Sequence, residues 1–215
     1  MSKYKVLYID EQSEERDIFE SLKDEELDIF VKHPYPTENE MMKFIWDEDF
    51  DAVIVDYGLM KNEPNVKYKG NDILERINET REDFPALIFT QDITQDDGVD
   101  EKVSSTRILL KDELDLDNPT LFKRKIKNYI KFYKSENLKL SEELHSLVKK
   151  RTAQNNQLSD NDLQRLDFLD GKIERRLNGK RVFPGLLKNS ENLKSLNAVI
   201  KDADKFLKSK LEKKK

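Results

Sequence analysis

The sequence contains no cysteine in its 215 residues. Disulfide bonds, thiolate metal ligands and cysteine nucleophiles are therefore excluded. Glycine and proline are also scarce, at six each, so most of the chain can form regular helices and strands. No apolar run approaches the roughly 18 residues that a membrane-spanning helix requires, and the first residues, MSKYKVLY, lead into an apolar run and not into a signal peptide. These absences predict a cytoplasmic protein with no membrane segment.

Charged residues, in contrast, are abundant and unevenly distributed. They make up 39% of the chain, against 36% hydrophobic residues, and the net charge is −5. Residues 1–118 contain 14 Lys and Arg against 32 Asp and Glu, a balance of −18, whereas residues 119–215 have a balance of +13. The contrast indicates two modules that bind different partners or attract each other.

Within the acidic half, four short apolar runs each stop at polar residues. The run KVLYI precedes Asp10 and Glu11, AVIV precedes Asp56, ALIF precedes Thr90, and RILL precedes Lys111. Apolar, β-rich runs of this length are typical of buried strands in a parallel sheet. Because the residues after the carboxyl ends of such strands meet at one crevice, these five polar residues are expected to lie together.

A further β-rich run, LDIFV at residues 27–31, and several amphipathic segments complete an alternating pattern. Helices are predicted at residues 13–22, 37–46, 71–79 and 95–103. Ser13 is expected to cap the first helix, and Thr37 and Glu40 are expected to form a capping box on the second. The alternation predicts an α/β fold with a doubly wound, five-stranded parallel sheet.

The order of acid pair, aspartate, hydroxyl and lysine at the strand ends resembles the receiver domain of two-component response regulators. The resemblance covers residues 1–120 and implies the flavodoxin-like form of the doubly wound fold. It also implies that Asp56 is the phosphoacceptor, a carboxylate nucleophile that forms an acyl phosphate. The implied phosphodonor is a sensor histidine kinase or a phosphotransfer protein.

The same resemblance implies a Mg²⁺ site and two phosphoryl contacts. The residues assigned to the metal are Asp10, Glu11, Asp56 and, through its backbone carbonyl, Gly58. Oxygen ligands suit this hard cation, and carboxylates at close quarters are costly without one. Lys111 is expected to pair with the phosphoryl oxygens, and the Thr90 hydroxyl to hydrogen-bond one of them once phosphate is present.

Several positions depart from the receiver pattern. Ile108 replaces the aromatic residue that is usual three positions before the lysine, and Asp112 replaces the usual proline after it. Gln91 stands where a small residue is usual, and Gly70 lies fourteen residues after Asp56, so the intervening loop is enlarged. The chemistry of the pocket is expected to be intact, but the usual coupling to output is altered. A receiver-like scaffold or adaptor that works without phosphorylation is therefore the alternative hypothesis.

The basic half begins with a segment, residues 121–158, that contains neither glycine nor proline. Asn118 and Pro119 are expected to be the cap and the first residue of its helix. Seam positions recur in alternating steps of four and three at Ile126, Ile130, Tyr133, Asn137, Leu140, Leu144, Leu147, Arg151, Gln154 and Leu158. This heptad pattern predicts a long, coiled-coil-like helix of roughly 58 Å. A homodimer through this segment and an intramolecular helical bundle are both compatible with the pattern.

The remaining residues, 159–215, form a predicted C-terminal helical region. Ser159 or Asp160 can cap its first helix, and a last helix is expected from Leu193 to Leu211. No catalytic constellation and no nucleotide-binding glycine loop follows the receiver, so the output is expected to be non-enzymatic, through assembly or partner binding. The basic residues leave nucleic acid binding as an alternative, although such charge more often forms a solvated helix face.

His145 is the histidine of the long helix. It follows the seam position Leu144 and is expected on the exposed side, where phosphotransfer histidines also lie. No phosphotransfer motif follows it, so an ordinary surface histidine is the favoured interpretation.

Overall fold

The computed structural model describes residues 3–61, 63–91, 104–153 and 158–177. The chain divides into two compact units: Lys3–Lys134, and a second whose described residues are 135–153 and 158–177. The helices predicted at residues 95–103 and 193–211 lie outside the described residues. Among the residues that are described, no helix is both long and apolar enough to cross a membrane.

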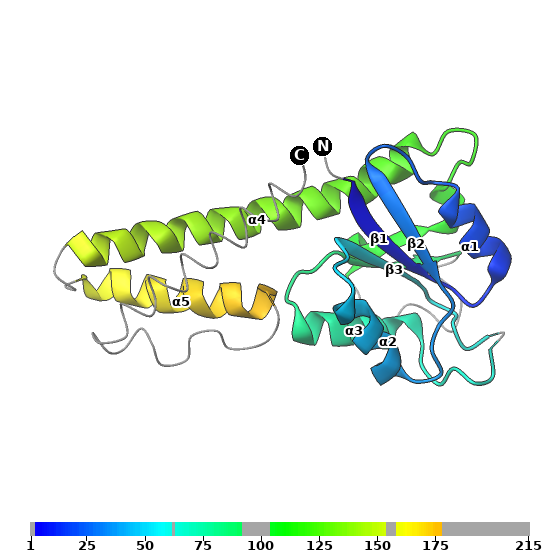
Figure 1. The fold of residues 1–215 in the computed structure, drawn as a ribbon, viewed down its shortest axis with the longest axis horizontal. Helices are drawn as coiled ribbons and strands as arrows, with labels where there is room; N and C mark the ends of the chain where they lie inside the picture. Colours follow the sequence, from blue (N-terminus) through cyan, green and yellow to red (C-terminus); the bar gives the residue numbers. More distant parts are fainter. Residues whose placement is uncertain (1–2, 62, 92–103, 154–157, 178–215) are drawn as a thin grey trace. The chain divides into compact units, whose positions relative to one another are not determined.

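The first unit is built on a five-stranded parallel sheet (Figure 1). Its strands are β1 (Tyr4–Ile9), β2 (Leu27–Lys32), β3 (Ala52–Asp56), β4 (Ala86–Thr90) and β5 (Ile108–Leu110). Their order in the sheet is β2-β1-β3-β4-β5, so the direction of winding reverses between β1 and β3. This is the strand order of flavodoxin-like doubly wound folds, and it confirms the predicted α/β sheet.

Helices cover both faces of the sheet. They are α1 (Ser13–Glu20), α2 (Glu38–Asp47), α3 (Gly70–Thr80) and the first part of α4 (Thr120–Ala153). Side chains of α2 and α3 pack on one face, and those of α1 and α4 pack on the other. Every residue of β3 and β4 is consequently buried, which explains why their sequences are apolar without alternation.

Alternate residues of β1 contribute to the two core layers. Leu7 and Ile9 lie in the layer of α2 and α3, whereas Val6 and Tyr8 lie in the layer of α1 and α4. In that second layer, Ile126 of α4 is fully buried. Because side chains of a strand alternate between faces, the residue after Ile9 is directed to the same side as Tyr8.

The helix starts confirm one predicted cap and correct another. Thr37 is the N-cap of α2, and its hydroxyl accepts the Glu40 N–H at 3.3 Å within a complete capping box. Ser13, in contrast, is the first helical residue of α1; Gln12 occupies the cap and makes no side-chain capping bond. The turn is instead organised by Asp10, whose Oδ1 accepts the Gln12 N–H at 2.8 Å.

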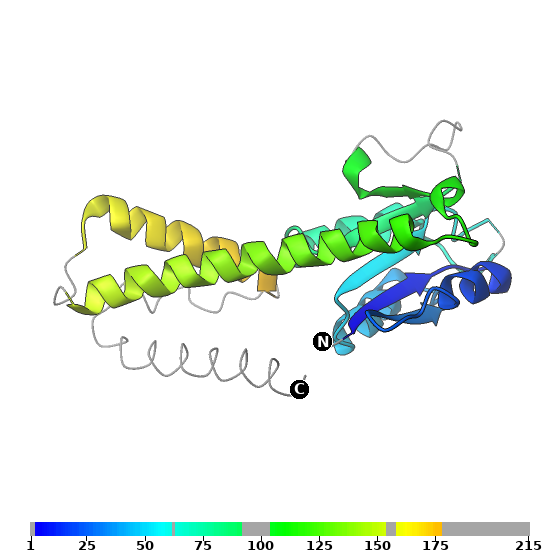
Figure 2. The same cartoon turned by 90° about the horizontal axis from the view of Figure 1, so that it is seen from above.

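Helix α4 is one continuous helix of 34 residues (Figure 2), which is about 51 Å at 1.5 Å per residue. It begins at Thr120, and the carbonyl of Pro119 accepts the Lys123 N–H at 2.9 Å. The helix therefore starts one residue later than Asn118 and Pro119 suggested. Its described end is Ala153, because residues 154–157 lie outside the described part of the chain.

The enlarged loop between β3 and α3 is folded onto the first unit. Leu59, Val66 and Tyr68 are buried in the core layer of α2 and α3. The Tyr68 hydroxyl donates to the carbonyl of Tyr35 at 2.7 Å. The extra residues thus extend the hydrophobic core beside β3.

The second unit contains a helical hairpin, formed by the later part of α4 and by α5 (Asp160–Leu177), which lie side by side in Figures 1 and 2. Its core consists of Val148 and Leu166, with Leu144, Leu147 and Leu158 packed against them. Seam residues of α4 thus pack on α5 of the same chain. This is the arrangement expected for an intramolecular helical bundle, one of the two possibilities that the heptad pattern allowed.

Polar contacts align the two helices of the hairpin. Lys150 Nζ lies 2.6 Å from Asp162 Oδ2. Arg165 donates to both carboxylate oxygens of Glu143, at 2.6 and 2.7 Å. The Ser159 hydroxyl accepts the Asp162 N–H at 3.2 Å, which confirms Ser159 as the cap of α5.

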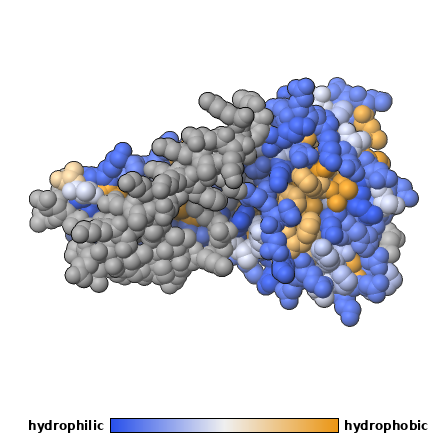
Figure 3. Space-filling view, in the orientation of Figure 1, coloured by the Kyte–Doolittle hydropathy of each residue, from blue (hydrophilic) through white to orange (hydrophobic). Residues whose placement is uncertain are grey.

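The face shown in Figure 3 is largely hydrophilic, with a few apolar patches. The exposed large apolar side chains of the first unit include Phe30, Met60, Leu116, Leu121 and Phe132. Exposed apolar residues of this kind are normal in globular proteins, so they do not by themselves mark a binding site.

Candidate functional site

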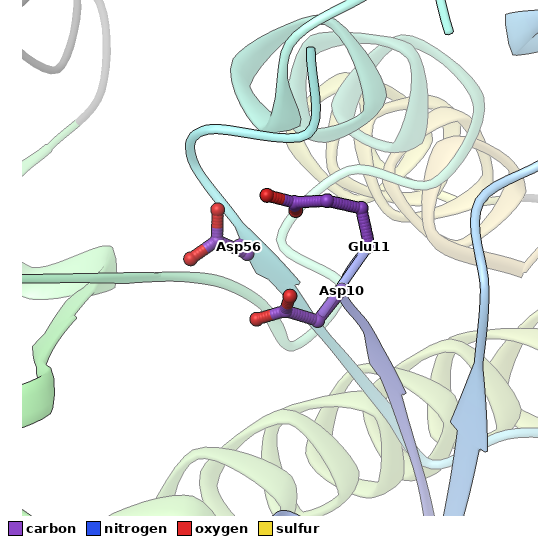
Figure 4. A group of neighbouring side chains, drawn as sticks. All are labelled: Asp10, Glu11 and Asp56. Atoms are coloured by element: carbon purple, nitrogen blue, oxygen red, sulfur yellow. The ribbon is translucent and has the colours of Figure 1, made fainter. Parts of the chain in front are cut away.

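Three carboxylates lie together at the carboxyl ends of β1 and β3 (Figure 4). Asp10 and Glu11 follow β1, and Asp56 is the last residue of β3. One oxygen from each residue lies within 4.8 Å of the other two. Asp10 and Asp56 are buried, at 0% and 6% exposure, so water solvates their charges poorly. The structure thus brings together the three acidic residues predicted from the strand ends.

Asp10 is held by donors to its carboxylate and to its backbone. The Tyr8 hydroxyl donates to Oδ2, and the Gln12 N–H donates to Oδ1 at 2.8 Å. Arg16 Nη1 donates to the backbone carbonyl of Asp10 at 2.7 Å. These contacts fix both the position and the rotamer of the Asp10 carboxylate.

Both oxygens of Asp56 are also engaged. The Gly58 N–H donates to Oδ2 at 2.5 Å, and Lys111 Nζ lies 2.9 Å from Oδ1. Burial raises the pKa of Asp56, and the negative charge of Asp10 raises it further, while the nearby Lys111 ammonium opposes both. A bound cation would favour the ionised carboxylate, since an opposite charge nearby lowers the pKa of an acid.

Lys111 is the first residue after β5, and its ammonium lies among several carboxylates. Besides Asp56, Nζ lies 3.6 Å from Glu15 Oε1 and 3.7 Å from Asp10 Oδ2. Burial alone would lower the pKa of Lys111, but the attraction of these carboxylates outweighs it and raises the pKa above its usual value. The pocket thus combines the charged Lys111 with four carboxyl groups, those of Asp10, Glu15, Asp56 and Glu11.

Thr90 and Gly58 also lie at this edge of the sheet. Thr90 ends β4 and is buried, one residue beyond Phe89, which is the register partner of Asp56. The carbonyl of Gly58 accepts the Lys61 N–H at 2.7 Å and closes a turn after β3. The phosphoryl contact of Thr90 and the metal contact of the Gly58 carbonyl both stay predictions.

The donor set suits a small hard cation. Ligands of one Mg²⁺ lie at about 2.1 Å from the ion and hence within about 4.2 Å of one another. The oxygens of Asp10, Glu11 and Asp56 lie within 4.8 Å of one another, so small movements suffice to bring them to one ion. All three are carboxylates, which favours magnesium, calcium or manganese over softer metals.

Three residues around the site were not predicted from the sequence: Tyr8, Glu15 and Arg16. Strand alternation places Tyr8 on the same side as Asp10, two positions later, and could have identified it. Glu15 and Arg16 lie in the first turns of α1, and no sequence signal distinguishes them from the other charged residues of that helix. His145, in the second unit, has intermediate exposure, and its assignment as an ordinary surface histidine stays a prediction.

No protein-family model matches the sequence, and no curated protein matches it either. Among solved structures, the chain is similar to the chemotaxis response regulator CheY4 of Vibrio cholerae, with 17% sequence identity and a TM-score of 0.42. The match covers 58% of this chain and 99% of that chain. Similarity at this level does not establish the function, which therefore has to be inferred from the residues of the pocket.

Proposed function

We propose that the chain is a response regulator whose first unit is a receiver domain that accepts a phosphoryl group on Asp56. The observation that supports this most directly is the surroundings of Asp56: Lys111 Nζ lies 2.9 Å from its carboxylate, and two further carboxylates complete a cation site beside it. A nucleophilic carboxylate, a fixed lysine and a cation site are together suited to phosphoryl transfer.

In this proposal, an oxygen of Asp56 attacks the phosphorus of a phosphorylated histidine or of a small phosphodonor. A new P–O bond forms, while the bond from phosphorus to the donor breaks and its electron pair leaves with the donor. Lys111 then donates to the phosphoryl oxygens as negative charge shifts away from the Asp56 carboxylate. Asp10, Glu11 and Asp56 would hold Mg²⁺, which supplies positive charge against the phosphoryl oxygens.

The output is proposed to pass from this pocket to the helical second unit. Thr90 and Lys111 would contact phosphoryl oxygens only in the phosphorylated state, so these contacts can shift a two-state equilibrium. Thr90 pairs with Leu110 of β5, and Lys111 follows directly. A change at either residue would therefore alter β5 and the segment that leads into α4. The proposed partners are a sensor histidine kinase or phosphotransfer protein and a target of the helical unit.

A phosphorylation assay tests this function. The full chain incubated with acetyl phosphate and Mg²⁺ should give a slower band on a phosphate-affinity gel. Asp56→Asn should abolish that band, because its amide cannot form the acyl phosphate. Asp117→Asn, an equivalent change at an exposed acid before α4, is the matched control and should retain it. A folded wild-type sample that never shifts would contradict the proposal.

A scaffold that works without phosphorylation is the second candidate, and two residues favour it. Ile108 is not the aromatic residue that receiver domains usually have three positions before the lysine. The exposed Asp112 stands where they usually have a proline. Replacement of the wild-type gene by one encoding Asp56→Ala separates the candidates. Full function of that variant in cells would favour the scaffold, and loss of function with normal protein levels would favour the phosphoacceptor.

A further inference from the structure

Tyr8 is a polar residue in the middle of an apolar core layer. It lies on β1, is fully buried, and shares its layer with Val6, Ile54 and Leu87. A buried hydroxyl is costly unless it finds a hydrogen-bond partner. The partner of Tyr8 is the Oδ2 atom of Asp10, two residues later on the same face of the strand.

The aromatic ring of Tyr8 is held in place from two sides. Phe19 of α1 stacks on it, with 4.0 Å between ring centroids and 17° between ring planes. Phe89 of β4 packs edge-on at 5.8 Å and 79°. Because the ring is buried and packs against both Phe19 and Phe89, its hydroxyl is held in one position, from which it donates to Asp10 in the pocket.

The hydroxyl also lies close to the contacts that the Lys111 ammonium makes with Asp10 and Asp56. The Oδ2 atom of Asp10 that accepts from Tyr8 lies 3.7 Å from Lys111 Nζ, whereas Asp56 Oδ1 lies 2.9 Å from the same Nζ. The Tyr8 hydroxyl thus donates to the same Asp10 oxygen that faces Lys111, while the ammonium lies closer to Asp56, the proposed nucleophile.

We infer that Tyr8 is a positioning residue of the cation site. It orients the Asp10 carboxylate toward Glu11 and Asp56, and it does so through one hydrogen bond from a packed ring. This inference rests on the proposed function only in taking the three carboxylates as a Mg²⁺ site. Groups that orient a metal ligand from behind commonly change metal affinity by about 10- to 100-fold when they are removed.

Tyr8→Phe tests the inference because it keeps the ring and removes only the hydroxyl. Titration of the full chain with Mg²⁺ in a calorimeter should show at least about tenfold weaker binding in the variant than in wild type. Tyr68→Phe is the matched control. It removes a hydroxyl that donates to Tyr35 at 2.7 Å in the other core layer, and it should leave Mg²⁺ affinity within twofold of wild type.

A second readout separates positioning from general stability. In the acetyl phosphate assay, the Mg²⁺ concentration for half-maximal phosphorylation should rise in Tyr8→Phe by the same factor as the dissociation constant. The final extent of phosphorylation at saturating Mg²⁺ should match wild type, whereas a misfolded fraction would lower that extent. Circular dichroism spectra of both tyrosine variants should coincide with that of wild type.

The outcomes distinguish this inference from the proposed function. Wild-type affinity in a folded Tyr8→Phe variant would overturn the role of Tyr8, even if Asp56 is phosphorylated. Weaker Mg²⁺ binding in Tyr8→Phe, together with a wild-type chain that never takes up phosphate, would uphold the role of Tyr8 and refute phosphorylation. Equal losses in Tyr8→Phe and Tyr68→Phe would also overturn the inference, since the effect would then not depend on Asp10.

Discussion

At the scale of single residues, Gly70 occupies a position where no side chain fits. A Cβ atom at Gly70 would lie 2.3 Å from the carbonyl oxygen of Asp56. The Gly70 N–H donates to the carbonyl of Tyr57 at 3.2 Å, so the chain is tied at this close approach. Helix α3 therefore begins in direct contact with the backbone of the proposed phosphoacceptor.

We expect Gly70→Ala to lower the free energy of unfolding by about 1–3 kcal/mol, because backbone atoms on both sides must move apart. The movement displaces Asp56, so phosphorylation by acetyl phosphate should slow as well. Urea denaturation measures the first effect, and the phosphate-affinity gel measures the second.

Gly171→Ala is the matched control, because it makes the same change where space is available. A Cβ at Gly171, within α5, would meet only the flexible end of Arg175, at 3.4 Å. Alanine is the better helix former by about 0.5–1 kcal/mol, so this variant should be more stable than wild type. A Gly70→Ala variant as stable as wild type would show that the close approach is not a constraint.

The residues of the pocket were predictable to different degrees. Asp10, Asp56 and Lys111 are each a charged residue directly after an apolar run, which made them recognisable in the sequence. The structure brings the three together. Tyr8 lies inside such a run, where an aromatic residue fits a strand equally well, so only its alternation with Asp10 could have pointed to its hydroxyl. Glu15 lies 3.6 Å from Lys111, a contact between residues far apart in the sequence that only the tertiary fold brings together.

At the scale of elements, two aspartates of α5 have pKa values that are shifted in opposite directions. The pKa of Asp170 is raised to about 6, chiefly by burial and also by the neighbouring negative charges of Glu174 and Asp167. The pKa of Asp162 is lowered, chiefly by its hydrogen bonds with Lys150 and Ser159. The ionised form of Asp170 is thus disfavoured in the hairpin, and that of Asp162 is favoured.

We expect Asp170→Asn to raise the melting temperature at pH 7.5, where ionised Asp170 destabilises the hairpin. The unfolded chain has a carboxyl pKa of about 3.9, so the wild type gains stability as the pH falls through about 6 toward 4. The advantage of Asp170→Asn should therefore disappear near pH 4.5. Helical circular dichroism during heating, at both pH values, measures the difference.

Asp162→Asn is the counterpart of opposite sign. It removes the ion pair with Lys150, at 2.6 Å, and should lower the melting temperature at pH 7.5. Because the pKa of Asp162 is already low, the loss should persist at pH 4.5 and fade only in stronger acid. If the change in melting temperature depended on pH in the same way in Asp162→Asn and Asp170→Asn, the opposite pKa shifts of the two aspartates would be contradicted.

Element boundaries were predicted best where local hydrogen bonds decide them. The capping box of Thr37 and the cap of Ser159 follow from nearest neighbours in sequence, and both are present. The start of α1 depends instead on Asp10, which is fixed by the pocket. The heptad seam of α4 identified an apolar face but not its partner, since period alone cannot distinguish α5 from a second chain.

At the scale of the whole molecule, part of the charge contrast between the two halves is neutralised within the first unit. Lysines of α4 pair with acids in the connections that precede β2 and β3, as Lys123–Asp24, Lys127–Glu26 and Lys134–Asp51. These lysines belong to the basic half by sequence but to the first unit by structure. Because these three lysines are paired with carboxylates, they contribute less positive charge toward nucleic acid phosphates than the sequence alone suggests.

Several seam positions of α4 are covered within the chain. Ile126 and Ile130 are buried in the first unit and Leu140 in the second, and Leu144 and Leu147 pack against the core that includes Leu166 of α5. A homodimer through residues 121–158 would therefore require α5 to leave the seam.

Leu166→Asp should force α5 to leave the seam, because the side chain is 3% exposed between the helices and a charge there is costly to bury. We expect the variant to show a mass above that of one chain in light scattering at concentrations where wild type is smaller. Phe168→Asp makes the same change on the same helix at a side chain that is 49% exposed, and it should leave the mass unchanged. If Leu166→Asp loses the helical signal of the hairpin but keeps the wild-type mass, the uncovered seam does not self-associate, and the output has to be sought in a different partner.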